Sequence, residues 1–460
     1  MSKRTIQLLA LSLSLALALS CCSGCTLLFS GGKTWTFGTE ETEGAGGSTP
    51  SLGEAAPTDA SAGMTQEPAI ENTVTFSETT LVSNGACAVT AVSFDPDGFW
   101  GPTFSLSIEN NTDKTLMFTL EDVSVNGYMC DPFWACEVTP GSKANSEVAW
   151  MDENLQEIGV NYLDQVEFRL RAYDSNDYSS DDVLNEIVTI QLDNSTTQPS
   201  VSELPSAHNF EAQMLIENAD ATLTLRDYDP EGEWGPTLVF YCENKTDRPL
   251  TFMMDGVSVN GFMCDPYWSC EVAPGKKALS HAYWAPETLA KSGINYLELI
   301  EFDLRLYDAD DWAADDILVE PLSIQLYNVY AQSSVSEVVF DAGFPQQTVV
   351  DTDALTVVAK GFDPEGYWGP TLIFYCVNKT DKTLMLSMSG VSVNGYMCDP
   401  YWSLEIAPGK KAYSDCAWTS SDLEGYGIVA FENVKFTLQV YDSNDWSADY
   451  IIDDVFQVTF

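Results

Sequence analysis

Beyond about residue 73 the chain alternates hydrophobic and polar side chains with the period of a β-strand. Phe104, Leu106 and Ile108 alternate with serines, and Val166 and Phe168 alternate with charged residues. Successive side chains of a strand point to opposite faces, so this alternation indicates strands that bury one face. Only residues 154–158 have the character of a helical turn. The pattern therefore predicts an all-β protein.

Turn residues separate the predicted strands at short intervals. Asn126-Gly127 is a dipeptide that two-residue type I′ hairpins favour, because both positions need a positive φ. Pro140-Gly141 fits a type II turn, in which proline fixes the first φ and glycine supplies the positive second one. Asn110 opens an Asn-x-Thr-Asp sequence that predicts another turn. Short strands with such turns are typical of an immunoglobulin-like β-sandwich.

The same unit occurs three times. An Asp-Pro-x-Gly-x-Trp-Gly-Pro segment starts at Asp95, Asp229 and Asp363, so the interval is 134 residues in both steps. This interval is too long for a solenoid repeat, which is about 20 to 50 residues, so each copy should have its own core. We therefore predict three tandem immunoglobulin-like β-sandwich domains, at residues 73–193, 206–329 and 339–460.

The N-terminus reads as a targeting segment. Lys3 and Arg4 precede an apolar stretch at residues 6–19, which is shorter than a membrane span. The cysteine cluster that follows resembles the lipobox of bacterial lipoproteins. The resemblance implies that residues 1–25 are a lipoprotein signal peptide and that Cys25 is lipidated, with Cys21 as the alternative. Plain secretion after cleavage nearby is a further possibility.

Residues 26–72 are rich in Gly, Ser, Thr, Ala, Pro and Glu and carry little apolar material. Such a segment cannot bury enough surface to offset its backbone entropy, so we predict a disordered low-complexity tether. With a lipid at its start, the tether would hold the folded repeats at the extracellular face of the membrane or in the cell wall.

Composition narrows the function further. The chain has 460 residues, with 69 acidic and 20 basic side chains and a formal net charge of −49. This charge argues against nucleic acid as a partner, because such binding depends on Lys and Arg neutralising phosphates. The two histidines, His208 and His281, leave little material for imidazole catalysis or a zinc site.

Four recurring sequences carry a family resemblance. They are an Asn-x-Thr-Asp-Lys turn, a Val-Ser-Val-Asn-Gly hairpin, a Pro-Gly-Lys-Lys turn at Pro274 and Pro408, and a Tyr-Asp strand end. Together they resemble the tandem Ig-like domains of unknown function in lipoproteins of Gram-positive bacteria, from about residue 73 to the end. Ser142 replaces the first lysine of the third sequence in the first copy. The resemblance implies fold and location, and it transfers no site residues.

An acidic loop near the end of each copy is a candidate calcium site. Ca²⁺ takes six to eight oxygen ligands from loops of this composition. The alternative is a solvated loop whose Asp and Asn residues favour turns. The candidate ligands are Asp174, Asn176, Asp177, Asp181, Asp308, Asp310, Asp311, Asp315, Asp442, Asn444, Asp445 and Asp449. No other cofactor is expected.

Aromatic residues recur at four positions of the unit. Strand register directs Trp134 and Trp150 into the sandwich, and Trp100, between two glycines, is expected to close one end of the core. The fourth position lies within the acidic loop and should face solvent. Its members are the candidate ligand-binding residues Tyr178, Trp312 and Trp446.

Nine cysteines follow the signal region, three in each copy. Cys242 and Cys376 replace Ile108, which is the behaviour of a small buried hydrophobic residue. We therefore expect buried thiols. A disulfide between Cys130 and Cys136 is the alternative, and it would need a tight turn between them.

These features predict a lipid-anchored extracellular surface protein that presents three Ig-like modules for adhesion or ligand binding. Its partners would be the membrane, through the N-terminal lipid, and an unknown glycan or protein. A carbohydrate-binding array and a pure structural spacer are the alternatives. A glycan hydrolase is disfavoured, and the protein is expected to be no enzyme. Its prominent acidic residues recur in all three copies, which is typical of a scaffold or a binding array and rare among enzymes.

Overall fold

The computed structural model describes residues 74–194, 199–201, 204, 206–311, 313–327, 333–340, 343–445 and 447–460. Nearly all of its regular structure is strand, arranged as tandem β-sandwiches, so the predicted fold class is confirmed. Ile70–Phe460 form one compact unit. Cys21, Cys25, the signal segment and the tether lie outside the described residues, and their assignments remain predictions.

Repeat 1 is a sandwich of two sheets. One sheet has the order β2-β3-β4-β8, and in the other β10 pairs with β9, β9 with β5, and β5 with both β6 and β7. The consecutive strands β2, β3 and β4 are thus neighbours in one sheet and form a meander. The elements are β1 (Val74–Thr75), β2 (Thr79–Ser83), β3 (Cys87–Asp95), β4 (Thr103–Asn110), β5 (Leu116–Val125), β6 (Tyr128–Met129), β7 (Ala135–Val138), β8 (Lys143–Ala149), α2 (Asp152–Glu157), β9 (Gln165–Asp174), β10 (Leu184–Gln191) and β11 (Asp193–Asn194).

Repeats 2 and 3 have the same order of elements. Repeat 2 has β12 (Gln213–Glu217), β13 (Ala221–Asp229), β14 (Thr237–Asn244), β15 (Leu250–Val259), β16 (Phe262–Met263), β17 (Ser269–Val272), β18 (Lys277–Tyr283), α3 (Pro286–Lys291), β19 (Leu299–Asp308) and β20 (Leu318–Gln325). Repeat 3 has β21 (Gln347–Asp351), β22 (Leu355–Asp363), β23 (Thr371–Asn378), β24 (Leu384–Val393), β25 (Tyr396–Met397), β26 (Ser403–Ile406), β27 (Lys411–Ala417), α4 (Ser420–Gly425), β28 (Asn433–Asp442) and β29 (Ile452–Thr459).

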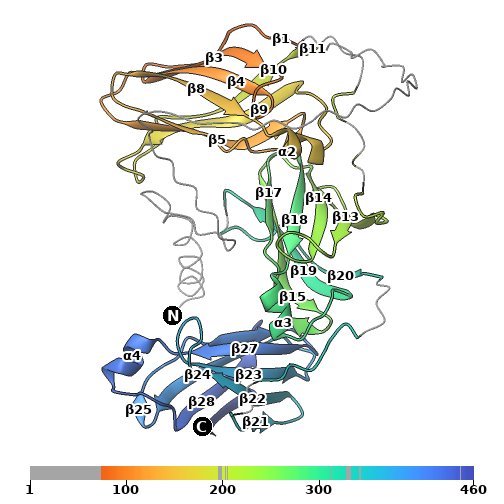
Figure 1. Cartoon of the computed structure of the whole chain (residues 1–460), viewed down its shortest axis with the longest axis vertical. Helices are drawn as coiled ribbons and strands as arrows, with labels where there is room; N and C mark the ends of the chain where they lie inside the picture. The colour runs from red at the N-terminus through yellow and green to blue at the C-terminus, as the bar shows by residue number, and fades with distance from the viewer. Residues whose placement is uncertain are drawn as a thin grey trace, which may run out of the picture. The chain divides into compact units, whose positions relative to one another are not determined.

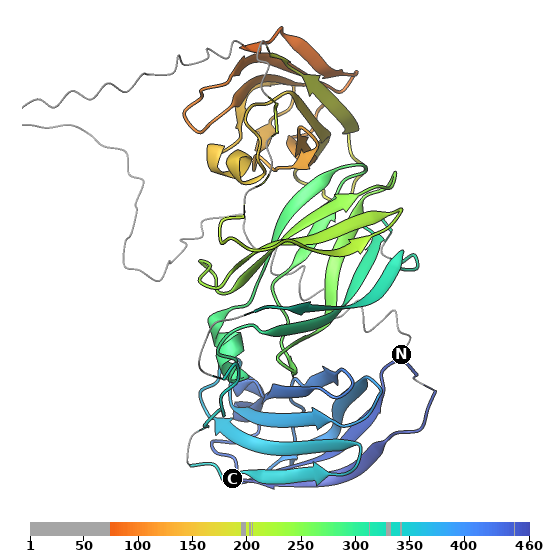
Figure 2. The ribbon, with the colours of Figure 1, turned by 90° about the vertical axis from the view of Figure 1, so that its right-hand side faces the viewer.

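The core of each repeat lies between its two sheets. In repeat 1, Phe104 and Ile108 of β4 are buried against Phe118 of β5 and Phe168 of β9. The alternating pattern of the sequence therefore predicts the buried face of these strands correctly. In repeat 3 the layer with β22, β23 and β27 faces the layer with β24 and β28 (Figure 1), and the turned view shows the same pair of layers (Figure 2).

The predicted hairpin at Asn126-Gly127 is confirmed. Asn126 and Gly127 have φ values of 50° and 85°, and they connect β5 to β6. The side chain of Asn126 also binds the segment that leads into β9. Its amide donates to the carbonyl of Tyr162, and its oxygen accepts from the N–H of Asp164 and Gln165. The turn residue thus also fixes the start of β9.

All nine described cysteines are free thiols, and all but Cys136 are buried. Burial raises the pKa of Cys130 and of Cys264 to about 12, so these thiols stay protonated at neutral pH. The expectation of buried thiols is confirmed, and Cys130 and Cys136 form no disulfide.

The sheets continue from one repeat into the next. Tyr128 of β6 forms a parallel bridge with Lys277 of β18, and Phe262 of β16 forms the same bridge with Lys411 of β27. We call each of these contacts a joint.

The helices α2, α3 and α4 have six residues each, and no helix of the described chain is long and apolar enough to cross a membrane.

Candidate functional site

The acidic loops place the predicted ligand-binding aromatics only in part. Tyr178 is exposed and leans toward Tyr173, with the ring centroids 5.7 Å apart. Trp312 and Trp446 lie outside the described residues. Their role in ligand binding therefore stays a prediction.

The first aspartate of each acidic loop contacts a basic side chain from the turn that follows β4 in repeat 1, β14 in repeat 2 and β23 in repeat 3. Asp174 lies 3.2 Å from Lys114, and Asp442 lies 3.0 Å from Lys382. In repeat 2, Asp308 lies 3.6 Å from a guanidinium nitrogen of the corresponding arginine. These ion pairs connect each acidic loop to the turn that carries the basic residue.

Most of the candidate calcium ligands accept hydrogen bonds from within the loop itself. Asp174 and Asp442 also accept the backbone N–H of Asn176 and Asn444, and Asp308 accepts that of Asp310. Asp177, Asp311 and Asp445 accept the N–H two residues further on, at Ser179, Ala313 and Ser447. Asp181, Asp315 and Asp449 are exposed. Among the described residues, no three or more His, Cys, Asp or Glu side chains form a group that could hold a metal ion. Calcium binding remains an untested prediction.

The tryptophans differ from expectation in one respect. Trp150 is buried beneath the β4 strand as predicted, and Trp134 is half-buried, with its indole N–H donating to Ser146. The prediction that Trp100 closes the core is wrong. Trp100, Trp234 and Trp368 are 66%, 59% and 73% exposed, respectively.

The backbone of the β3–β4 loop explains why Trp100 points outward. The N–H of Gly101 donates to the carbonyl of Gly98, and the hydroxyl of Thr103 donates to the carbonyl of Gly101. Trp150 in turn donates its backbone N–H to Pro102, so the loop is tied to the end of β8 by its main chain. None of these hydrogen bonds uses the Trp100 side chain, and its indole lies in solvent.

A neighbouring aromatic enlarges this loop in two of the repeats. Phe99 and Trp100 form an edge-to-face pair with centroids 4.9 Å apart, and Tyr367 and Trp368 form the same pair at 5.0 Å. Both partners of each pair are exposed. Repeat 2 has Glu233 at the corresponding position, so its loop combines an aromatic ring with a carboxylate.

A second set of exposed aromatics lies at the same end of the sandwich. Tyr267 and Tyr401 are exposed, as is Phe133 in repeat 1. Tyr267 bridges to Tyr283, which is paired in register with Thr237, the first residue of β14 after the Trp234 loop. The rings of Tyr267 and Tyr283 are also stacked, with centroids 5.2 Å apart.

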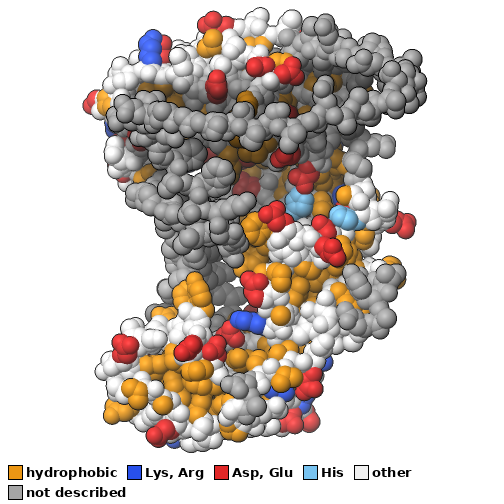
Figure 3. All heavy atoms as spheres, viewed as in Figure 1, with side chains coloured by type: hydrophobic (Ala, Val, Ile, Leu, Met, Phe, Trp, Pro, Cys, Tyr) orange, Lys and Arg blue, Asp and Glu red, His pale blue; other side chains and the backbone are white. Residues whose placement is uncertain are grey.

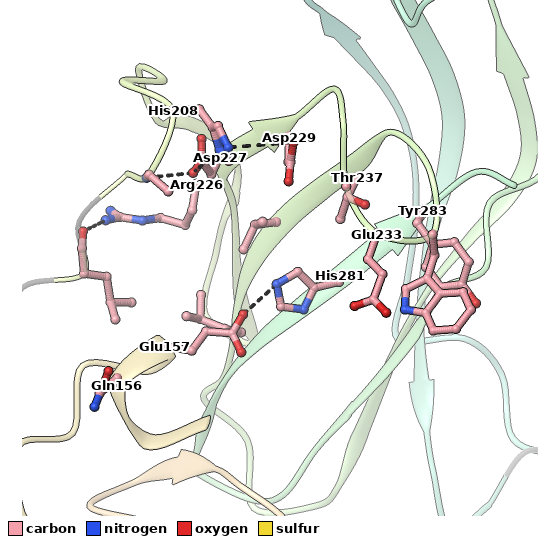
Figure 4. A pocket seen from close by; sticks show the side chains of 16 residues that line it. Gln156, Glu157, His208, Arg226, Asp227, Asp229, Glu233, Thr237, His281 and Tyr283 are labelled. Atoms are coloured by element: carbon pink, nitrogen blue, oxygen red, sulfur yellow. Dashed lines mark hydrogen bonds and ion pairs between the residues drawn. The ribbon is translucent and has the colours of Figure 1, made fainter. Parts of the chain in front are cut away.

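In repeat 2 the tryptophan loop borders a groove of about 450 Å³ (Figure 4). Trp234, Tyr283 and Glu233 line it together with both histidines, and Glu157 of α2 reaches into it from repeat 1. The imidazoles, pale blue in Figure 3, lie at the surface among acidic side chains.

Each imidazole in the groove contacts a carboxylate. His281 Nε2 lies 2.8 Å from Glu157, and this hydrogen bond lowers the pKa of the Glu157 carboxyl. His208 Nδ1 lies 3.1 Å from Asp227. Burial opposes ionisation of Asp227, but hydrogen bonds from His208 and from two backbone N–H groups outweigh it, so the pKa of Asp227 is lowered.

The arrangement suits binding of a ligand with both an apolar face and polar groups. Trp234 and Tyr283 line the groove with aromatic side chains, while Glu233 and the imidazole–carboxylate pairs offer donors and acceptors nearby. Ligand sites commonly combine apolar walls with a few polar groups in this way. The sequence signal that could have revealed the site is the recurrence of tryptophan in a loop, outside any strand register. No protein-family model matches the chain, and no curated protein is detectably similar to it.

Proposed function

We propose that the protein is a lipid-anchored extracellular surface protein whose three β-sandwich repeats serve adhesion or ligand binding. The observation that carries this proposal is the exposed tryptophan loop, which recurs in every repeat at Trp100, Trp234 and Trp368. Contiguous exposed apolar surface marks interaction sites, and in repeats 1 and 3 a second exposed aromatic ring packs against the tryptophan. Trp and Tyr also contribute most to binding free energy at protein interfaces.

The anchor is supported by the sequence. A basic n-region and a short apolar stretch lead to the cysteine cluster that ends at Cys25, with Cys21 as the alternative lipidation site. A low-complexity segment of this length would separate the repeats from the lipid by tens of ångströms, about 35 Å on average.

Carbohydrate is the ligand class that the groove of repeat 2 favours. A sugar ring has an apolar face that can stack on an indole and hydroxyl groups that can hydrogen-bond to carboxylates and imidazoles. Trp234, Glu233 and His281 offer such groups around one groove. Three weak sites in one chain would add avidity for a repetitive glycan without strong binding at any single site.

The test is a glycan and protein array probed with the chain from residue 26 onward. We expect binding to a repetitive ligand, and a variant with Trp100→Ala, Trp234→Ala and Trp368→Ala should lose about tenfold or more in apparent affinity. Each single substitution should cost less, because the remaining loops still engage the ligand.

Tyr327→Ala is the matched control, since it removes an exposed aromatic that belongs to neither candidate site. The proposal is contradicted if the triple variant binds as strongly as the natural chain, or if Tyr327→Ala weakens binding as much as the triple variant. If the array shows no binding to any ligand, the protein is a spacer instead.

A further inference from the structure

Both joints use the same backbone contact. The N–H of Lys277 donates to the carbonyl of Gly127 at 3.0 Å, and the N–H of Lys411 donates to that of Gly261 at 3.0 Å. The hairpin of one repeat thus extends the edge strand of the next. The ammonium of each lysine lies above the aromatic ring of the hairpin, at 5.6 Å from the centre of Tyr128 and 5.3 Å from that of Phe262.

An ion pair accompanies each backbone contact. Lys276 lies 2.6 Å from Glu167 in the first joint, and Lys410 contacts Glu301 in the second. The two lysine side chains retain only 15% and 18% exposure. A cation so far removed from water needs a carboxylate partner, because an unpaired charge there carries a large desolvation cost.

The third hairpin, Asn394 to Met397, has no such partner within the part of the chain that the structure describes. Tyr396 and Met397 are 53% and 59% exposed, whereas Phe262 at the position of Tyr396 is only 7% exposed in its joint. Tyr396 leans toward Tyr426, with the centroids 6.0 Å apart. An exposed apolar hairpin therefore remains in repeat 3, whereas the hairpins of repeats 1 and 2 are buried or half-buried.

At the positions that form the ion pair of each joint, the unjoined sides of repeats 1 and 3 carry different residues. Lys435 stands in repeat 3 at the position of Glu167 and Glu301. At the other end, Ser142 in repeat 1 replaces Lys276 and Lys410. The first repeat of a second copy would therefore offer Lys435 a hydroxyl group rather than a carboxylate.

We infer that the hairpin end of repeat 3 is an open half of a joint, and that its partner is a β-sandwich edge strand with a carboxylate at the position of Lys276. The strand would donate a backbone N–H to the carbonyl of Gly395, cover Tyr396 and Met397, and place its carboxylate against Lys435. Addition of a strand to an exposed sheet edge is a common mode of recognition, in which side chains supply the specificity.

The test converts the chain into its own partner. Ser142→Glu supplies the carboxylate on the edge strand of repeat 1, so the variant, from residue 26 onward, should associate head to tail with Lys435 of the next molecule. Such a contact is head to tail, so it should produce a concentration-dependent series of oligomers, as open chains or closed rings, in sedimentation velocity. We expect association at least about tenfold stronger than in the natural chain, and weaker at high salt.

Charge-reversed variants make the result specific. Ser142→Lys places two lysines opposite each other and should stay monomeric, and adding Lys435→Glu should restore association through the pair used in the internal joints. Met397→Asp in the Ser142→Glu background should abolish association. The inference is overturned if Ser142→Glu and the Ser142→Lys, Lys435→Glu variant both stay monomeric. It is equally overturned if Ser142→Lys alone, or the natural chain, associates as strongly as Ser142→Glu.

Discussion

At the scale of single residues, an aspartate that ends a long strand holds the acidic loop in each repeat. In repeat 3 this residue is Asp442, which contacts Lys382 and accepts the backbone N–H of Asn444. The hydrogen bond from Lys382 is the main reason that the pKa of Asp442 is lowered, and the N–H of Asn444 adds to it. The carboxylate therefore stabilises the fold only while it is ionised.

This residue predicts a pH dependence. The pKa of Asp442 is lower in the folded chain than in the unfolded chain, where it is about 3.9. Its contribution is complete above the unfolded value and is lost as the pH falls through the folded value. The melting temperature of the natural chain should therefore fall between about pH 5 and about pH 2.5, and Asp442→Asn should make this fall smaller. Asp353→Asn, which removes an exposed carboxylate from another turn, should leave that fall unchanged. An equal slope for Asp442→Asn and the natural chain would contradict this account.

The buried asparagine of each repeat shows what residue type alone does not reveal. The sequence marks Asn244 as a turn residue, which is correct, but its amide also donates to the carbonyls of Arg248 and Val272 at 2.7 and 2.8 Å. Asn244 is therefore an internal anchor between the end of β14 and the end of β17. Local sequence predicts the turn, whereas the contact with Val272 exists only in the folded sandwich.

At the scale of elements, a glycine sets the loop that carries each exposed tryptophan. Gly235 has a φ of 116°, and a Cβ at this position would lie 2.1 Å from the carbonyl oxygen of Trp284. The loop can therefore approach the end of β18 only without a side chain at Gly235. This close approach leaves Trp234 beside the groove.

Substitution of this glycine should displace the loop. We expect Gly235→Ala to lower the free energy of unfolding of repeat 2 by about 2 kcal/mol or more, because it adds a clash to an unfavourable backbone conformation. Gly256→Ala is the matched control, since Gly256 has a φ of 60° with no atom within 4 Å of the added Cβ. The control should cost about 1 kcal/mol from backbone strain alone. Calorimetry would measure both, and equal costs would show that the contact with Trp284 does not matter.

The two tryptophans of this region show how far strand periodicity extends. Trp150 directly follows β8, so the register of Val148 predicts its burial correctly. Trp100 lies in a loop where the alternation has ended, and the flanking glycines identify a turn without fixing the direction of the side chain. The prediction of a buried Trp100 fails for that reason. The candidate site depends on this direction, so the sequence could identify its residues but not their exposure.

At the scale of the whole molecule, the acidic residue and its partner exchange positions between the two joints, as the repeat interval makes visible. Glu157 pairs with His281 in the first joint, and at the same positions of the second joint Lys291 pairs with Asp415 at 2.6 Å. The predicted domain bounds leave residues 194–205 as the connection between repeats 1 and 2. The hairpin contacts could not be predicted from periodicity, because they join segments of different repeats, although the exchange of residue types is readable from the sequence.

Exchanging these charges in the first joint should test the pair. Glu157→Lys would face a lysine toward His281, and we expect hydrogen exchange at the Lys277 amide, which donates to Gly127, to rise about fivefold. Adding His281→Asp recreates the pair of the second joint and should restore slow exchange. The Lys411 amide of the second joint is the internal control. Equal exchange in the single and double variants would show that the contact between these two side chains does not stabilise the joint.

The small size of each backbone contact between repeats has a mechanical consequence. A single bridge connects β6 to β18, whereas β5 and β9 within repeat 1 share eight paired positions. If the chain is anchored at its N-terminus and holds a ligand, as we propose, tension between the two would separate the joint before either sheet of a sandwich is torn. Every repeat would then stay folded, and the joints would re-form when the tension ends. The joints would thus yield to tension by reversible separation instead of by unfolding of a repeat.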